Sequence, residues 1–318
     1  MNKVIILAYN EAKFIGRTIE SIYDRFDEII VINDKSKDNT LQIVTDLKEK
    51  FPKIKILSNK KNIGPGKSLE LGLSLALETS CKFIVKIDGD NQFLPDDIIN
   101  LVELAEKHNV DFIKCDRFWA KGITGKIPKI RYLGNSIASI LIKFTTSNKN
   151  INDPLNGLFL FSSRVASKIY LPKIFYRYGY PFYINAFVSK LSLLEDYKLK
   201  QYRNVVNYAD EKSNLNPFII FSKLIIFSII NFFGSIKIKL KNSQHQTSGV
   251  LDIISIITIT LAFYSIKMII SIRFFEYQGN QGSWTILCLA FLILTFKVIS
   301  NSESNMSENF KKQFNYIN

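Results

Sequence analysis

Short apolar runs alternate with amphipathic helical segments over roughly the first 110 residues, and this alternation constrains the fold more than any other feature. Strand and helix in alternation is the pattern of a parallel sheet covered by helices on both faces. We therefore predict an α/β fold with a mostly parallel sheet. The runs expected to be its first strands are 4–8, 28–32, 54–58 and 83–87.

The fourth run ends abruptly in Asp88, Gly89 and Asp90, with Gln92 close behind. Carboxylates at the carboxyl end of a parallel strand lie where open α/β sheets bind ligands. A hard divalent cation takes one or two carboxylates together with phosphate oxygens. The loop is therefore a candidate for holding a metal-bound diphosphate, although such a tripeptide alone is more often a solvated acidic turn.

Composition narrows the choice of partners. The chain has 318 residues, a net charge of +14 and 47% hydrophobic residues, which suits one large domain with an apolar appendage. No arginine-rich stripe with interleaved aromatic residues is present, so we predict no nucleic-acid partner. Basic charge beside apolar segments favours an anionic membrane surface. The three cysteines match no metal-ligand spacing and predict a reduced compartment, and the run 4–8 is too short for a signal peptide.

The last hundred residues contain two segments long enough to span a membrane. Residues 253–272 are apolar except for Lys267, and 283–300 carry only the charge of Lys297. Both reach the lower end of the length that spans hydrocarbon, and each lysine is near an end, where it can reach the interface. The short connection predicts a transmembrane helical hairpin. The alternative, two buried core helices, fits poorly because neither segment has a polar face.

A third apolar segment, 218–236, could span the membrane or lie in its interface. Lys237, Lys239 and Lys241 follow it, and the positive-inside rule assigns them to the cytoplasm. We therefore expect one interfacial helix and then two spans, which makes a multi-pass protein of the plasma (inner) membrane with both its N-terminal domain and its tail in the cytoplasm. The expected divisions are 1–217, 218–249, 250–300 and 301–318.

Six motifs resemble, in their order along the chain, those of the family-two inverting glycosyltransferases. They are V-I-I-L-A-Y-N-E-A at 4–12, I-N-D-K-S-K-D-N-T at 32–40, N-I-G-P-G-K-S-L-E-L-G at 62–72, D-G-D-N-Q-F-L-P-D-D-I at 88–98, D-P-L-N-G-L-F-L-F at 153–161 and Y-A-D-E-K-S-N-L at 208–215. The metal loop is similar to that of the dolichol-phosphate mannosyltransferase and polyprenyl-phosphate glycosyltransferase branch, many of whose members carry a two-span membrane anchor. The resemblance covers about residues 3–217 and implies the Rossmann-like GT-A fold.

The resemblance also implies a reaction. It implies a hexosyltransferase that uses Mg²⁺ or Mn²⁺ and moves a sugar from a nucleoside-diphosphate sugar to a polyprenyl phosphate at the cytoplasmic face, in cell-envelope biogenesis. Association into homo-oligomers is compatible with it. The residues implied to contact the nucleotide sugar are Ala8, Tyr9, Asn10, Glu11, Asp34, Asn62, Gly64, Lys67, Asp88, Gly89 and Ser213.

The same resemblance implies a catalytic set. Asp90 and Gln92 would ligate the metal ion. Arg117 and Arg131 match basic residues that face the acceptor phosphate in polyprenyl-phosphate relatives, a task that suits the bidentate guanidinium. Asp153, directly before a proline, is a candidate general base or a turn residue.

Plainer interpretations stay open for several of these residues. Asn10 and Glu11 could cap the first helix, Lys67 could be a solvated lysine and Ser213 a loop hydroxyl. The second motif has Asn33 where relatives have Asp, so the preferred nucleotide is undetermined. Two other functions remain alternatives: transfer to a sugar hydroxyl of a lipid-linked glycan or cell-surface polysaccharide, with Asp153 as base, and a non-catalytic nucleotide-binding membrane protein.

Overall fold

The computed structural model describes residues 1–119, 123–124, 129–207, 217–274 and 280–317. The chain divides into two compact units. The first, the catalytic unit, contains Met1–Thr145, Lys149–Ile229 and Gln313–Asn318. The second, the hairpin unit, contains Thr146–Asn148 and Ile230–Lys312.

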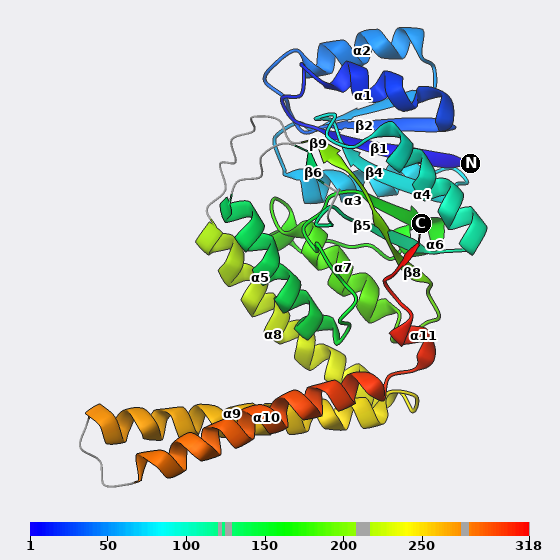
Figure 1. Cartoon of the computed structure of the whole chain (residues 1–318). Helices are drawn as coiled ribbons and strands as arrows, with labels where there is room; N and C mark the ends of the chain where they lie inside the picture. Colours follow the sequence, from blue (N-terminus) through cyan, green and yellow to red (C-terminus); the bar gives the residue numbers. More distant parts are fainter. Residues whose placement is uncertain (120–122, 125–128, 208–216, 275–279, 318) are drawn as a thin grey trace. The chain divides into compact units, whose positions relative to one another are not determined.

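One mixed sheet forms the centre of the catalytic unit (Figure 1), and its strand order in the described residues is β10-β8-β5-β7-β4-β1-β2-β3. Neighbouring strands are parallel, except that β7 runs antiparallel to both β4 and β5. The predicted α/β class is thereby confirmed. The strands are β1 (Asn2–Ala8), β2 (Glu28–Asn33), β3 (Ile54–Ser58), β4 (Phe83–Asp88), β5 (Phe112–Asp116), β7 (Phe159–Ser162), β8 (Leu199–Arg203) and β10 (Asn315–Ile317), and β6 (Ile123–Thr124) pairs with β9 (Val206–Asn207) in a separate ribbon.

Helices cover both faces of the sheet because its central strands are apolar on both sides. In β1, Ile5 packs with α3 and α7, whereas the next residue, Ile6, packs into the cluster that contains α1, α2 and α4. Proline at the first position starts α3 and α4, and α7 has proline at its second position. The helices are α1 (Ile15–Ile22), α2 (Thr40–Lys50), α3 (Pro65–Ala76), α4 (Pro95–His108), α5 (Lys129–Thr146), α6 (Ser163–Ala166) and α7 (Tyr180–Leu191), with 3₁₀ turns at Tyr23–Arg25 and Lys173–Phe175.

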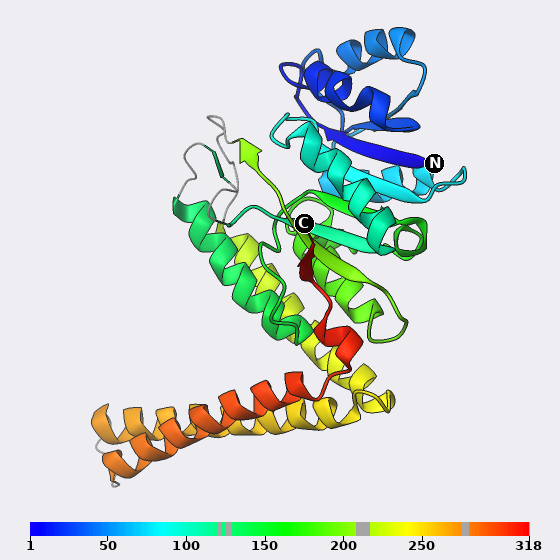
Figure 2. The ribbon, with the colours of Figure 1, turned by 45° about the vertical axis from the view of Figure 1, so that its right-hand side comes forward.

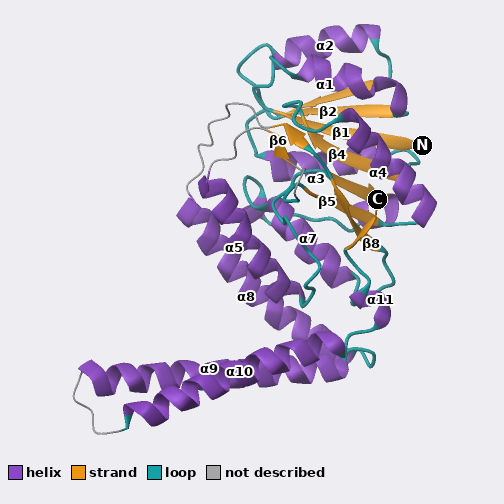
Figure 3. Cartoon of the chain, in the orientation of Figure 1, coloured by secondary structure: helices purple, strands orange, loops and turns teal. Residues whose placement is uncertain are grey.

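Long apolar helices make up the hairpin unit. Helix α8 (Pro217–Lys241) passes from the catalytic unit into it at residue 230, and α9 (Gln246–Phe274) and α10 (Gln281–Ser304) pack along each other as a hairpin (Figures 2 and 3). Within the described part of the chain, three helical stretches are long and apolar enough to cross a membrane: Ile219–Lys241, Gln246–Arg273 and Gln281–Ser302. The expected interfacial position of 218–236 remains a prediction.

A buried polar cluster lies where the hairpin unit begins. The Lys239 ammonium is fully buried and lies 2.7 Å from an Asp252 oxygen, whose other oxygen accepts a hydrogen bond from the Ser302 hydroxyl at 2.5 Å. A buried ion pair needs such additional hydrogen bonds because desolvation of both charges is costly. Lys239, which counted toward the predicted orientation, is therefore a paired interior residue.

The end of the chain returns to the catalytic sheet. After α11 (Glu308–Lys311), β10 pairs in parallel with β8 through Asn315–Lys200, Tyr316–Gln201 and Ile317–Tyr202. Phe314 is fully buried and its ring meets Phe112 edge to face at 6.4 Å between centroids. The last residues of the predicted tail are thus part of the catalytic unit.

Candidate active site

A cavity of about 470 Å³ opens at the carboxyl ends of β1, β2 and β4. This is the edge at which open α/β sheets bind ligands. Seven of the residues predicted for the nucleotide sugar or metal line it: Ala8, Tyr9, Glu11, Asp34, Asn62, Asp88 and Asp90. The remaining lining residues are Leu7, Pro65, Ser68, Arg177 and Tyr178.

The first two motifs are joined by hydrogen bonds across the sheet edge. Asn10 adopts a positive φ of 60°, donates from its backbone N–H to the Ser36 hydroxyl at 3.0 Å, and accepts from the Lys37 N–H at 2.8 Å. The Glu11 N–H donates to the Thr40 hydroxyl at 2.8 Å. Helix α1 starts at Ile15, with Phe14 as its N-cap and no side-chain cap hydrogen bond. Neither Asn10 nor Glu11 is the N-cap, so the capping interpretation is wrong for their side chains, although the Glu11 carbonyl accepts from the Phe14 and Ile15 N–H groups, both at 2.9 Å.

Asp34 organises the loop that precedes α3. Its carboxylate is buried and accepts hydrogen bonds from Asn59 at 2.9 Å and from the N–H groups of Ile63 and Gly64, both at 2.8 Å. Oδ1 accepts two of these hydrogen bonds and Oδ2 only one, so Oδ2 has a further acceptor site for a ligand. Gly64 has φ 94°, and a Cβ there would lie 2.7 Å from Arg177 Cγ, so only glycine fits.

Lys67 lies outside the cavity lining. It forms an ion pair with Glu70, and its ammonium lies 5.4 Å from the centroid of the Tyr176 ring. The hydrogen bond and charge of Glu70, against some burial, raise the pKa of Lys67. Lys67 is thus paired with Glu70 and is not simply a solvated lysine, and its role as a ligand of the nucleotide sugar remains a prediction.

Asp88 forms an ion pair with a buried lysine of the same strand. Lys86 is fully buried and its ammonium lies 2.7 Å from Asp88 Oδ1. Burial disfavours the charged form, but the Asp88 carboxylate outweighs it and raises the pKa of Lys86 above its usual value. Gly157 makes room for the pair, since a Cβ there would lie 2.9 Å from Asp88 Oδ2 and 3.0 Å from Lys86 Nζ. Tyr180 lies over the same ammonium, at 5.4 Å from its ring centroid.

The predicted metal ligands carry the right donor atoms. Asp90 lines the cavity, and its Oδ1 accepts a hydrogen bond from the Gln92 N–H at 3.2 Å, which keeps the two residues together. A carboxylate and an amide carbonyl are hard oxygen donors, and Mg²⁺ or Mn²⁺ takes its other ligands from phosphates and water. Among the described residues no group of three or more His, Cys, Asp or Glu side chains could enclose a metal ion. The donor set thus fits an ion that arrives with a diphosphate.

Arg117 and Asp153 meet at the same edge of the sheet. The Arg117 Nε lies 3.0 Å from Asp153 Oδ2, Nη2 donates to Oδ1 at 3.3 Å, and the Arg117 backbone N–H donates to Oδ2 at 3.1 Å. Both β5, which ends just before Arg117, and β4 run antiparallel to β7, so Arg117 and Asp88 leave the sheet in the same direction. Burial raises the pKa of Asp153, and Arg117 and Lys114 oppose that rise.

Two predicted residues receive no side-chain test. Arg131 belongs to the first turn of α5, but its side chain lies outside the described part of the structure. Ser213 lies in 208–216, which the structure does not describe.

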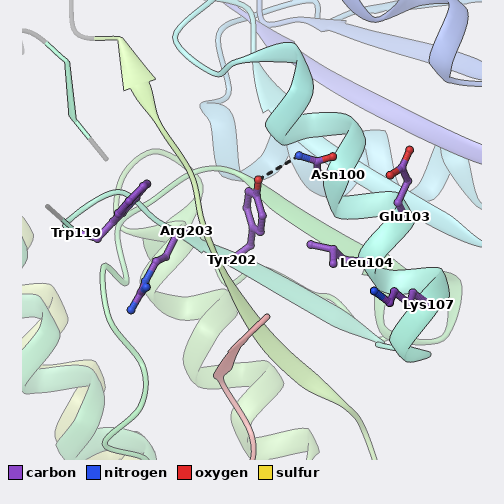
Figure 4. Close-up of a pocket in the computed structure, with 7 residues that line it drawn as sticks. All are labelled: Asn100, Glu103, Leu104, Lys107, Trp119, Tyr202 and Arg203. Carbon is purple, nitrogen blue, oxygen red and sulfur yellow. Dashed lines mark hydrogen bonds between the residues drawn. The ribbon is translucent and has the colours of Figure 1, made fainter. Parts of the chain in front are cut away.

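A second cavity, of about 510 Å³, lies between α4 and β8 and contains none of the predicted site residues (Figure 4). Its lining residues are Asn100, Glu103, Leu104, Lys107, Trp119, Tyr202 and Arg203. Asn100 donates to the Tyr202 hydroxyl at 3.3 Å, and that hydroxyl donates to Asp97 at 2.8 Å. The acidic and basic side chains that line this cavity form no recognisable catalytic or ligand-binding arrangement, so the first cavity remains the candidate active site.

Sequence reasoning missed three contributors to the site. Lys86 carried a usable signal, because a charge within a buried strand demands a partner nearby. Arg177 bonds Asn62 at 2.7 Å and lines the cavity, but nothing in its local sequence marks it. Tyr178, the next residue, also lines the cavity without a recognisable pattern.

Comparison with known proteins assigns the class. Residues 3–170 match the family described as glycosyl transferase family 2, which is more than half of the 318 residues. The chain therefore belongs to glycosyl transferase family 2, a class of glycosyltransferases, as its motifs predict.

Two named relatives are archaeal. The UDP-N-acetylglucosamine–dolichyl-phosphate N-acetylglucosaminyltransferase of Methanococcus voltae is 27% identical over 172 residues, covering 50% of this chain and 68% of that protein. The dolichol-phosphate mannosyltransferase of Pyrococcus furiosus is 28% identical over 180 residues, covering 54% and 49%. The chain spans about half to two thirds of the length of the curated relatives it matches.

A solved structure extends the likeness to the fold. The crystal structure of S. aureus TarS 1-349 in complex with UDP-GlcNAc superposes with a TM-score of 0.50 at 14% identity, covering 98% of this chain and 89% of that one. At this identity the likeness concerns the fold alone, and it agrees with the predicted GT-A class.

Proposed function

We propose that this chain is a membrane-associated inverting glycosyltransferase that moves a sugar from a nucleoside-diphosphate sugar to a polyprenyl phosphate at the cytoplasmic face. The observation that carries the proposal is that carboxylates and an arginine lie at the same edge of the sheet. A carboxylate-lined cavity lies at the ends of β1, β2 and β4, and Arg117 follows β5 at that edge. The names of the two archaeal relatives, both dolichyl-phosphate enzymes, support a lipid-phosphate acceptor.

The outer face of α5 supports an acceptor that lies in a membrane. Large apolar side chains stand exposed along it, up to 69% for Ile140, on a helix whose first turn contains Arg131. An exposed apolar helix face of this length fits the headgroup boundary of a bilayer. The exposed residues are Tyr132, Leu133, Ile137, Ile140 and Phe144.

The chemistry follows from the charges at the two ends of the reaction. An oxygen of the acceptor phosphate attacks the anomeric carbon, the new carbon–oxygen bond forms, and the bond to the nucleoside diphosphate breaks with inversion. A phosphate monoester is already anionic near neutral pH, so the attack needs little general-base help. Arg117, detached from or shared with Asp153, would orient that phosphate through its planar fork of donors.

Asp90 and Gln92 would hold Mg²⁺ or Mn²⁺ together with the donor diphosphate. Such an ion, when bound, neutralises the charge that builds on the departing nucleoside diphosphate. Lys86 and Gly157 keep Asp88 in a fixed position at the floor of the same cavity, and Asp34 fixes the loop that carries Asn62. Preorganised charges of this kind cost no rearrangement during reaction.

A hydroxyl acceptor on a lipid-linked glycan is the second candidate, and one observation favours it. Asp153 is a buried carboxylate whose pKa is raised by that burial, which makes it a stronger base than an exposed aspartate. Its ion pair with Arg117 argues against this role, since the pair must open before Asp153 can accept a proton.

A donor screen on detergent-purified protein tests the proposal. Nucleoside diphosphate release from UDP-, GDP- and dTDP-sugars is followed with Mn²⁺ or Mg²⁺, with and without undecaprenyl phosphate. We expect release that requires the metal, the lipid phosphate and Asp90. Release that ignores the lipid would favour the glycan acceptor, and absence of release with every donor would contradict both reactions.

A further inference from the structure

Strand β10, near the end of the chain, contacts the residues that directly precede Arg117 and Asp153 in the sequence. Tyr316 of β10 donates its hydroxyl hydrogen to Asp116 Oδ2, and Asn152 Nδ2 donates to the same hydroxyl oxygen at 2.8 Å. Asp116 directly precedes Arg117, and Asn152 directly precedes Asp153. One phenol therefore links the two short segments whose next residues form the ion pair.

Asp116 transmits this contact to the turn that carries Arg117. Its Oδ1 accepts a hydrogen bond from the Phe118 N–H at 2.9 Å, while its Oδ2 accepts from Tyr316. The carboxylate thus closes a turn with Arg117 at its centre. Burial, together with the Asp116 carboxylate, raises the pKa of Tyr316, so the phenol stays protonated and remains a donor at neutral pH.

The segment 150–153 is fastened to the tail along its length. Asn150 donates to the Gln313 carbonyl at 3.2 Å and to the Asn315 side chain at 3.0 Å. Gln201 of β8 joins both sides, since its amide nitrogen donates to the carbonyls of Asn150 and Phe314 at 2.6 and 2.5 Å. Its oxygen accepts from the Asn152 N–H at 2.9 Å. The backbone before Asp153 therefore depends on β10 for its position.

We propose that the segment 313–317 is a positioning element of the acceptor site, in which Tyr316 holds Arg117 and Asp153 in the geometry that receives the acceptor phosphate. That the acceptor is a phosphate rests on the proposed function, whereas the positioning of Arg117 and Asp153 by Tyr316 does not. Tyr316 is a positioning residue, because its contacts reach the reacting groups through Asp116 and Asn152.

The chain offers a matched control for removal of the hydroxyl. Tyr202 also donates its hydroxyl to an aspartate, Asp97, and accepts from an asparagine, Asn100, in the second cavity (Figure 4). Both Tyr316→Phe and Tyr202→Phe lose the same pair of hydrogen bonds, but only the first loses them beside Arg117. In Tyr316→Phe the ring that stacks on Arg203, at 4.5 Å from its guanidinium, is retained, so β10 keeps its packing.

The kinetic arm compares both variants with the wild-type protein. For Tyr316→Phe we expect an increase of about tenfold in KM for undecaprenyl phosphate, which corresponds to about 1.4 kcal/mol, with KM for the donor sugar and kcat within about twofold. For Tyr202→Phe we expect all three constants within about twofold of wild type. Equal acceptor KM values in the two variants would overturn the proposal.

Hydrogen exchange provides an arm that needs no turnover. Peptides covering 115–119 and 150–156 should lose protection in Tyr316→Phe and in Asn152→Ala, and keep it in Tyr202→Phe. Unchanged exchange in both peptides would overturn the positioning role, whatever the acceptor. If wild-type protein transfers no sugar to lipid phosphate but these peptides lose protection, the proposed function fails while the positioning of Arg117 and Asp153 by the tail stands.

Discussion

The half of the catalytic sheet that we propose binds the donor (the donor half) and the half that we propose binds the acceptor (the acceptor half) are built in different ways. The donor half, β1 to β4, is a run of parallel strands whose polar residues follow each strand directly in sequence. The acceptor half, β5, β7, β8 and β10, is mixed in direction and joins residues as far apart as Asp116 and Tyr316. The proposed site residues of the first half therefore lie in contiguous motifs, whereas those of the second half are positioned by contacts between distant parts of the sequence.

This difference teaches where each half should be vulnerable. Changes in the donor half would remove the proposed ligands of the nucleotide sugar or its metal, so they should act directly on chemistry. Changes in the acceptor half that only reposition Arg117 and Asp153, such as Tyr316→Phe, should act on binding of the acceptor. The predictions below test whether that separation holds.

The largest effect is expected for Asp90→Ala in the donor half. Loss of the carboxylate removes the predicted metal ligand, and we expect the rate of nucleoside diphosphate release to fall by about a thousandfold or more, because the ion supplies several kcal/mol. Asp96→Ala, at an exposed position of the same motif, is the control and should leave the rate within about twofold. If the variant keeps a tenth of the wild-type rate or more, Asp90 is not a ligand of the catalytic metal ion.

Gly157→Ala tests the point at which the two halves touch. The added methyl would lie 2.9 Å from Asp88 Oδ2 and 3.0 Å from Lys86 Nζ, so the ion pair must shift. We expect KM for the donor to rise by about thirtyfold, the effect of displacing a partly buried hydrogen bond between charged groups. Gly16→Ala, whose Cβ would meet nothing closer than 3.8 Å, should leave donor KM unchanged. An unaltered donor KM in Gly157→Ala would show that Asp88 does not contact the donor.

Asp153→Asn asks which acceptor the second half serves. With a phosphate acceptor we expect turnover to fall by about tenfold or less, since the base is dispensable and only the pair with Arg117 is weakened. With a hydroxyl acceptor the loss should reach several orders of magnitude, and the proposed acceptor would then be wrong. Asp97→Asn, a buried aspartate that bonds Tyr202 and the Val205 N–H, controls for general destabilisation.

The smallest effect is expected for Arg177→Lys. Arg177 donates to the Asn62 side chain at 2.7 Å and to its carbonyl at 3.1 Å, and lysine cannot reproduce both bonds in one plane. We predict a rise of about threefold in donor KM, because the side chain is exposed and solvent screens its contacts. Arg164→Lys, which disrupts an exposed pair with Glu195, should have no effect on KM and so serves as the reference.

The sequence by itself determined the parallel half of the fold and its motifs. Strand positions were predictable because residues such as Ile29 to Ile32 are buried on both faces, which leaves an uninterrupted apolar run. Seven predicted residues line the donor cavity because polar groups at the ends of neighbouring parallel strands meet without any long-range information. The positive φ of Asn10 was not predictable, since it depends on contacts with Ser36 and Lys37.

Only the tertiary structure decided the partners of the charged residues. Lys86 with Asp88, Arg117 with Asp153, and Lys239 with Asp252 are pairs that burial selects, because an unpaired charge in the interior is too costly. No local sequence pattern predicts that β10 joins the sheet. These three residues form a strand because the edge of β8 is open to pairing and because the preceding Phe314 is buried in the core. Such contacts join residues up to 200 positions apart, and no pattern of local spacing encodes them.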